Sequence, residues 1–133
     1  VNQPHAFYLK YFLNNEINVL VWNYRGYGRS TNSEPTPQAL QHDSETVLKY
    51  LKEVIGVRGK IGVYGRSLGG IPTTYLADQV DMVVADRTFC NFKSLSVRKF
   101  YSFVSQYLFK FITCNWVANN DLNFSKKEEK IAI

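Results

Sequence analysis

The sequence predicts an α/β fold built on a doubly wound, mostly parallel β-sheet. Two observations lead to this fold class. Short and uniformly apolar runs alternate along the chain with segments whose apolar residues recur at helical spacing. A strand that is apolar on both sides is typical of a parallel sheet covered by helices on both faces. The 133 residues, 45% of them hydrophobic, are enough for one folded domain, so residues 1–133 are treated as a single domain.

The predicted elements of the first third are a helix, a strand and a loop. Aromatic residues at helical spacing predict a helix over about 5–15. The strongly apolar run at 18–23 (NVLVWN) predicts a buried strand. Residues 24–37 are rich in glycine, serine, asparagine and proline, which predicts a loop.

A second helix and a second strand are predicted next. Thr36 followed by Pro37 is typical of a helix start, because the hydroxyl can cap the first turn and proline suits the first helical position. The helical period continues until Gly56, where a helix of this kind usually ends. The apolar run at 60–64 (KIGVY) then predicts a buried strand, and a helix is expected over about 68–79.

The last part of the chain completes the alternation. Residues 82–85 predict a third apolar strand, and an aromatic-rich segment over about 92–113 predicts a helix. A polar stretch at 119–130 follows, and the sequence ends on 131–133 (IAI), which is typical of the start of another strand.

The strongest functional signal is the pattern Gly65-x-Ser67-x-Gly69 between a predicted strand and a predicted helix. A serine at the tip of such a tight turn has strained backbone geometry, and we expect the two flanking glycines because the neighbouring positions are crowded. The turn would expose the serine hydroxyl and point the backbone N–H of Leu68 toward a developing oxyanion. A glycine-rich turn that binds phosphate or merely connects the two elements is the alternative.

Two segments of the sequence resemble the α/β-hydrolase superfamily: residues 19–30 (VLVWNYRGYGRS) and residues 62–70 (GVYGRSLGG), with a helix containing Asp43 between them. The chain is most similar to the serine-aminopeptidase-like branch, which includes protein depalmitoylases and membrane-associated lipases. The resemblance covers most of residues 7–92. It implies that Ser67 is the nucleophile and that the Leu68 amide is one oxyanion donor.

The same resemblance implies a serine hydrolase that cleaves an ester, thioester or amide through an acyl-serine intermediate. Its substrate is expected to be acyl or lipid-like, and no cofactor or metal is implied. The segments 18–23, 60–64 and 81–85 correspond to the fourth, fifth and sixth strands of the family's sheet. The chain is therefore expected to be the central part of one hydrolase domain, with a sheet that is incomplete at both ends and no activity by itself.

The remaining members of a catalytic triad are not evident in the sequence. In this fold the triad follows the order serine, then acid, then histidine. The two histidines, His5 and His42, both precede Ser67. Asp86, at the end of the sixth strand, is a possible acid, and its structural alternative is an ion pair with Arg87 or a turn residue. The family's acid and histidine are otherwise expected beyond the chain.

The formal net charge of +5 resides mainly in residues 93–133, which hold seven of the 16 basic side chains but three of the 11 acidic ones. These basic residues are scattered among apolar ones, so nucleic-acid binding is not expected. Lys99 and Lys110 lie within the aromatic segment, which is either ordinary core or a lid over an acyl pocket. A membrane-facing lid is a hypothesis that follows from the second alternative.

Several other classes of protein are disfavoured. Cys90 and Cys114 form no Cys-x-x-Cys pair, which argues against a disulfide framework or a zinc site. No apolar run approaches 18 residues and no signal leader is evident, so a cytoplasmic or membrane-associated location is expected. Neither nucleotide-binding glycine motif occurs, which weakens a nucleotide-binding interpretation. The main alternative to an enzyme is a hydrolase-fold module that binds an acyl chain or a protein without catalysis.

Overall fold

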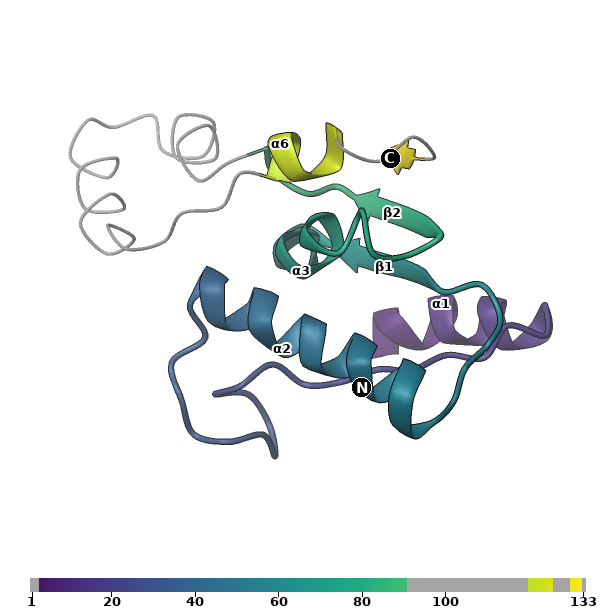
Figure 1. Ribbon diagram of the computed structural model, residues 1–133, viewed down its shortest axis with the longest axis horizontal. Helices are drawn as coiled ribbons and strands as arrows, with labels where there is room; N and C mark the ends of the chain where they lie inside the picture. The colour runs from purple at the N-terminus through teal and green to yellow at the C-terminus, as the bar shows by residue number, and fades with distance from the viewer. Residues whose placement is uncertain (1–2, 91–119, 126–129, 133) are drawn as a thin grey trace.

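The computed structural model describes residues 3–90, 120–125 and 130–132 (Figure 1). From α2 onward its described elements alternate between helix and strand, as the sequence predicts. In order they are the α-helices α1 (Gln3–Asn14) and α2 (Pro37–Lys49), the π-helical turn η1 (Tyr50–Val54), the strand β1 (Gly62–Arg66), the 3₁₀ turn η2 (Ser67–Gly69), the α-helix α3 (Gly70–Tyr75), the strand β2 (Met82–Asp86), the α-helix α6 (Asn120–Ser125) and the strand β3 (Lys130–Ala132). The helix predicted at 92–113 lies outside the described residues.

The described strands form one parallel sheet in the order β1-β2-β3. Figure 1 shows β1 and β2 side by side, and the register pairs Arg66 with Asp86 at their carboxyl ends. β1 begins and ends two residues later than predicted, so it runs directly into Ser67. The parallel strand pairs confirm the predicted α/β class for this part of the chain, whereas a complete doubly wound hydrolase sheet stays a prediction.

The strand predicted at 18–23 is wrong, because this segment pairs with no strand of the described sheet. Its side chains are also less buried than expected: Val21 is 63% exposed and Leu20 is 38% exposed. Among the described residues, the buried indole N–H of Trp22 has no hydrogen-bond acceptor. An apolar run indicates burial, but a strand forms only where a neighbouring strand pairs with its backbone groups.

The first two predicted helices are confirmed. α1 spans Gln3–Asn14, and α2 begins at Pro37 with Thr36 as its cap, the threonine hydroxyl accepting a hydrogen bond of 3.2 Å from the Ala39 N–H. The helical path continues through η1 and ends at Gly56, which has a left-handed φ of +74°. Glycine adopts that conformation without the penalty that a Cβ brings.

Helices cover both faces of the described sheet. Successive side chains of a strand point to opposite faces. Val63 packs in an apolar cluster with residues of α2 and α3, while Tyr64, the next residue of β1, contacts Tyr8 of α1 with ring centroids 5.4 Å apart. α1 therefore lies on the face opposite α2 and α3.

The apolar core lies between the sheet and the pair α2 and α3. One cluster fills the space beside the strands and consists of Leu48, Leu76, Ala77, Val80 and Val83. A second cluster lies under the turn that follows β1, where Leu40 and Ile71 are completely buried. This second cluster supports the segment that carries Ser67, because Leu68 packs against it.

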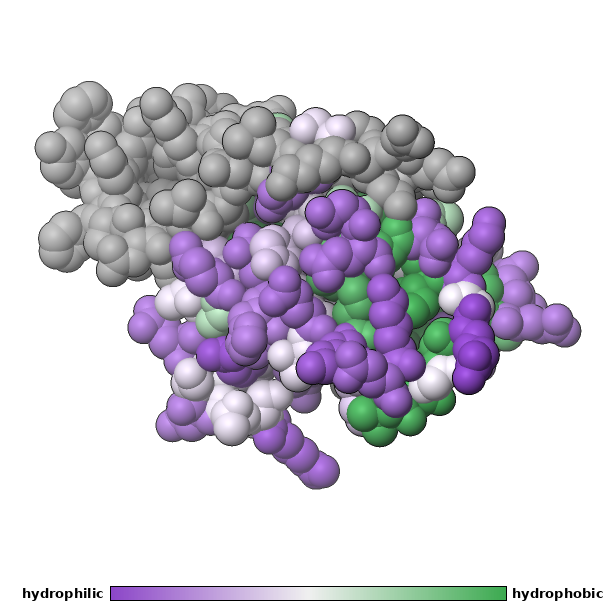
Figure 2. All heavy atoms as spheres, viewed as in Figure 1, coloured by the Kyte–Doolittle hydropathy of each residue, from purple (hydrophilic) through white to green (hydrophobic). Residues whose placement is uncertain are grey.

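Some apolar side chains remain on the surface. Figure 2 shows apolar atoms gathered near the end of η1, where Val54 is 69% exposed and Ile55 is 55% exposed. η1 precedes β1 and Ser67 follows it. This exposed apolar area and Ser67 therefore belong to opposite ends of β1.

Candidate active site

Ser67 lies at the tip of the sharp turn predicted between β1 and the following helix. β1 ends at Arg66, the 3₁₀ turn begins at Ser67, and α3 begins at Gly70. Ser67 has a φ of +53°, a left-handed conformation that is rare for any residue with a Cβ. Its side chain is exposed. The turn therefore presents the serine hydroxyl to solvent at the carboxyl end of the sheet.

The glycines around Ser67 have unequal roles. A Cβ at Gly65 would overlap the Thr73 hydroxyl and the Gly69 carbonyl, which confirms the expected crowding before the serine. The same expectation is wrong for Gly69, where a Cβ would lie 3.5 Å from the Tyr24 hydroxyl, an ordinary contact. The second crowded position is Gly70, where a Cβ would overlap the side chain of Thr88.

Both the backbone and the side chain of Leu68 contribute to the turn. It is the second residue of a helical segment that starts at Ser67, and the first N–H groups of a helix have no acceptor within it. Its side chain packs against Leu40 and Ile71. The packed side chain anchors the residue while its N–H remains at the start of the helical turn.

Thr88 and Asn120 are site residues that the sequence analysis missed. The Thr88 hydroxyl donates a hydrogen bond of 2.8 Å to the Ser67 carbonyl, and the buried Asn120 side chain contacts Thr88 in turn. No spacing rule links these positions to the serine. The one signal in the sequence is the second glycine of the Gly69-Gly70 pair, which indicates a close approach at Gly70.

Asp86 is buried at the carboxyl end of β2, with 4% of its surface exposed. One carboxylate oxygen accepts a hydrogen bond of 2.6 Å from the Tyr64 hydroxyl and lies 3.7 Å from the Arg66 Nε. The other oxygen lies 3.5 Å from the Arg87 Nε, which confirms the ion pair predicted as its structural alternative. Burial and the Asp86 hydrogen bond raise the pKa of Tyr64 well above its ordinary value. A catalytic role for Asp86 stays a prediction.

The two histidines do not complete a triad in the described structure. His42 is on α2 with its side chain 74% exposed, and its Nδ1 lies 3.9 Å from a Glu45 carboxylate oxygen. His42 is therefore a surface residue of α2. His5 belongs to α1, and its side chain lies outside the described ones. Within the described residues, the Ser67 hydroxyl makes no hydrogen bond to a general base.

Arg25, in the 24–37 loop, forms an ion pair with Asp43 of α2. Its Nε donates a hydrogen bond of 2.8 Å to the Asp43 carboxylate of α2, and a second nitrogen bonds the other carboxylate oxygen. The hydrogen bond to Arg25 lowers the pKa of Asp43, and the same bond raises the pKa of Arg25. This pair fastens the loop to α2 and supports a structural role for Arg25.

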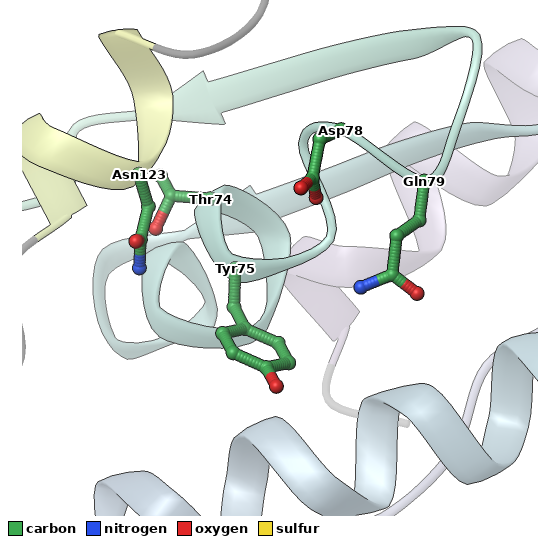
Figure 3. A pocket seen from close by; sticks show the side chains of 5 residues that line it. All are labelled: Thr74, Tyr75, Asp78, Gln79 and Asn123. Carbon is green, nitrogen blue, oxygen red and sulfur yellow. The ribbon is translucent and has the colours of Figure 1, made fainter.

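A small polar pocket of about 130 Å³ lies beside α3 and α6 (Figure 3), and Ser67 is not among its lining residues. It is lined by Thr74, Tyr75, Asp78, Gln79 and Asn123. Known small-molecule sites are several times larger and mostly apolar, so this pocket does not suit an acyl substrate. In the described part of the chain, no group of three His, Cys, Asp or Glu residues is arranged to hold a metal ion.

The combination of a parallel strand, an exposed left-handed serine and a following helix is the arrangement expected for the nucleophile turn of an α/β hydrolase. Comparison with known proteins agrees with this class. The chain is 33% identical to the protein bem46 of Schizosaccharomyces pombe over 116 residues, which cover 84% of this chain and 38% of that protein. It is 38% identical over 66 residues to the alpha/beta hydrolase domain-containing protein aho-3 of Caenorhabditis elegans, covering 49% of this chain and 20% of that protein. These similarities support membership of the α/β-hydrolase superfamily.

A third similar protein, from Saccharomyces cerevisiae, is named an uncharacterized membrane protein; it is 32% identical over 111 residues, 79% of this chain and 37% of its own length. The chain thus spans well under half the length of the curated relatives it matches. No family model matches the chain, and no solved structure matches it significantly. Among the described residues, no helix has both the length and the apolarity needed to cross a bilayer.

Proposed function

We propose that the protein is a serine hydrolase in which Ser67 attacks an ester, thioester or amide and carries the acyl group as a covalent intermediate. The observation that carries this proposal is the exposed Ser67 hydroxyl, at a φ of +53° on the turn between β1 and the first helical turn. Such a strained geometry persists only where the surrounding structure holds it, and it is concentrated at functional sites.

The Leu68 N–H is the first oxyanion donor in this proposal. It follows the nucleophile directly, as the fold's mechanism requires, and it has no acceptor within its own helical turn. When the Ser67 oxygen attacks a carbonyl carbon, negative charge develops on the carbonyl oxygen. A preorganised N–H aimed at that oxygen stabilises the transition state more than the ground state.

The general base and its acid belong, in this proposal, to parts of the whole protein outside these 133 residues. Both histidines precede Ser67, whereas the fold's triad order is serine, acid, histidine. The chain also spans only 38% of its similar protein from Schizosaccharomyces pombe. Without an imidazole to accept its proton, the Ser67 hydroxyl is a weak nucleophile at neutral pH. The isolated chain is therefore expected to lack turnover.

The proposed substrate is acyl or lipid-like, and a membrane-associated location suits such a substrate. One similar protein is named a membrane protein. The lid hypothesis for Lys99 and Lys110 concerns residues outside the described ones. Substitution of both lysines by glutamate in the whole protein is expected to weaken sedimentation with vesicles that contain anionic lipid. Unchanged sedimentation would refute the membrane-facing lid.

The decisive experiment uses the whole protein that contains this chain, with Ser67→Ala and, as a matched control, Ser33→Ala at an exposed serine of the 24–37 loop. Hydrolysis is measured on p-nitrophenyl esters of increasing acyl length and on an acyl thioester. We expect Ser67→Ala to lower kcat at least about 1,000-fold and Ser33→Ala to leave kcat unchanged. A fluorophosphonate should label the peptide that contains Ser67. Activity that survives Ser67→Ala would refute Ser67 as the nucleophile, whereas a parent protein without turnover or labelling would favour the non-catalytic binding module.

A further inference from the structure

The carbonyl oxygen of Ser67 is held by two donors from different parts of the fold. It accepts a hydrogen bond from the Gly70 N–H at the start of α3. It also accepts one of 2.8 Å from the Thr88 hydroxyl, 21 residues further along the chain. A carbonyl oxygen has two lone pairs, so both of its acceptor directions are occupied.

Asn120 fixes the direction of the Thr88 hydroxyl. The Asn120 side-chain amide donates to the Phe89 carbonyl at 2.8 Å and, over a longer 3.5 Å, to the Thr88 oxygen. Its amide oxygen lies 3.2 Å from the Thr74 hydroxyl of α3, which also donates a shorter hydrogen bond of 2.7 Å to the Gly70 carbonyl. A hydroxyl that accepts from an amide directs its own hydrogen elsewhere, here to the Ser67 carbonyl.

The close contact between Thr88 and α3 fixes the position of the Thr88 hydroxyl. A Cβ at Gly70 would overlap the Thr88 side chain, so only glycine allows this approach. Asn120 is buried, with 2% of its surface exposed, and its N–H donates to the Cys90 carbonyl at 2.9 Å. Thr88 is thus held between the first residue of α3 and the first residue of α6.

The two hydrogen bonds to the Ser67 carbonyl also determine where the Leu68 N–H points. These two groups belong to one peptide unit, which is planar, and no peptide bond in the described structure is cis. In a trans peptide the C=O and the N–H point in opposite directions, so fixing one fixes the other. Ser67 has a left-handed φ, where its peptide unit would not rest without external restraint.

We propose that Thr88 is a positioning residue that aims the Leu68 N–H at the oxyanion through the Ser67–Leu68 peptide plane, with Asn120 orienting its hydroxyl. This inference rests on the proposed hydrolase function. It assigns Thr88 a role in the transition state and none in binding the ground-state substrate. Loss of the hydroxyl should therefore lower kcat and leave KM nearly unchanged.

The test uses the whole protein with Thr88→Val, which keeps the shape and removes the hydroxyl, and Thr88→Ser, which keeps the hydroxyl. Thr46→Val is the matched control, because it removes a threonine hydrogen bond of 3.0 Å to a carbonyl on α2. Competent sites are counted with a fluorophosphonate, and kcat and KM are measured per counted site. The affinity for a boronic acid, which mimics the tetrahedral oxyanion, is measured in parallel.

We expect Thr88→Val to lower kcat per site and boronic-acid affinity together by about fivefold to tenfold, with KM within about twofold. Thr88→Ser is expected to restore both, and Thr46→Val to leave both unchanged. If Thr88→Val does not fold, Thr88→Ala gives the same comparison, because it also lacks the hydroxyl and is smaller.

Parent-like kcat and boronic-acid affinity in the variant that lacks the hydroxyl would overturn the positioning role alone. A parent protein whose Ser67 is not labelled and whose activity survives Ser67→Ala would overturn the hydrolase proposal, and this inference with it. The two failures are therefore distinguished by the parent protein and its Ser67→Ala variant.

Discussion

The Arg25 guanidinium binds both carboxylate oxygens of Asp43, a residue 18 positions away on α2. Both side chains are about three-quarters buried, so the contact is neither a surface pair nor a fully desolvated one. Arg25 is the second residue of the 24–37 loop, which leads to the cap of α2. The pair therefore connects the start of the loop to the helix at its end. The Arg25 guanidinium is already engaged with the Asp43 carboxylate.

The Arg25–Asp43 pair should make stability depend on pH in a specific direction. The hydrogen bond to Arg25 lowers the folded-state pKa of Asp43. The pair therefore stabilises the fold above the unfolded-state pKa of about 3.9, and this stabilisation is lost as the pH falls through the lower folded-state value. We expect Asp43→Asn to lower the Tm of the whole protein at about pH 7 and to differ less from the parent at about pH 3. Glu53→Gln, which alters an exposed pair with Lys49, should have little effect at either pH. A gap between Asp43→Asn and the parent that stays constant with pH would contradict this assignment.

The two glycines of the serine motif should differ in their tolerance of a methyl group. Gly65→Ala forces a Cβ into the Gly69 backbone and should destabilise the protein by about 1–3 kcal/mol. In Gly69→Ala the new Cβ makes only an ordinary contact with Tyr24, so this variant should lose less free energy of unfolding. Gly59→Ala is the control, because nothing lies within 4 Å of a Cβ there. Urea unfolding of the three variants gives the comparison, and equal losses at Gly65 and Gly69 would refute it.

Gly70 and Thr88 should be coupled in a double-mutant cycle. Gly70→Ala forces overlap with the Thr88 side chain, whereas Thr88→Ala removes the hydroxyl, the nearest atom, and the methyl group, and leaves only the Cβ in close contact. The double variant is therefore expected to be more stable than the sum of the two single changes predicts, by about 1 kcal/mol or more. Free energies of unfolding for the four proteins provide the test. Simple additivity would show that the two residues do not share this contact.

The sequence was sufficient to predict elements that depend on local chemistry. Thr36 and Pro37 start α2, and Gly56 ends the helical path, because capping and left-handed glycine are properties of a few adjacent residues. Gly65 and Ser67 indicated the turn for the same reason. At Gly65 part of the crowding comes from the backbone of Gly69, only four positions away.

The features that failed depend on partners distant in the sequence. The 18–23 segment has the composition of a strand, but no described strand pairs with it. The helix predicted over 68–79 ends at Tyr75, and α6 lies in a stretch that composition alone describes as polar. Thr88 reaches the serine, and Asn120 reaches Thr88, only through the tertiary fold, 21 and 53 residues beyond Ser67 along the chain. Nothing in local spacing predicts such contacts.

Asp86 and Tyr64 provide the last test, because a structural carboxylate and a catalytic one respond differently to substitution. Tyr64→Phe removes the 2.6 Å hydrogen bond to the buried Asp86 and should destabilise the protein by about 1–3 kcal/mol. Asp86→Asn keeps the shape but removes the charge that faces Arg66 and Arg87, and it too should lower stability. If Asp86 only holds the strand ends together, kcat per titrated site should stay within about threefold of the parent, whereas loss of a triad acid costs about 10⁴-fold. A loss of the larger size, with the number of titrated sites unchanged, would identify Asp86 as the acid of the triad.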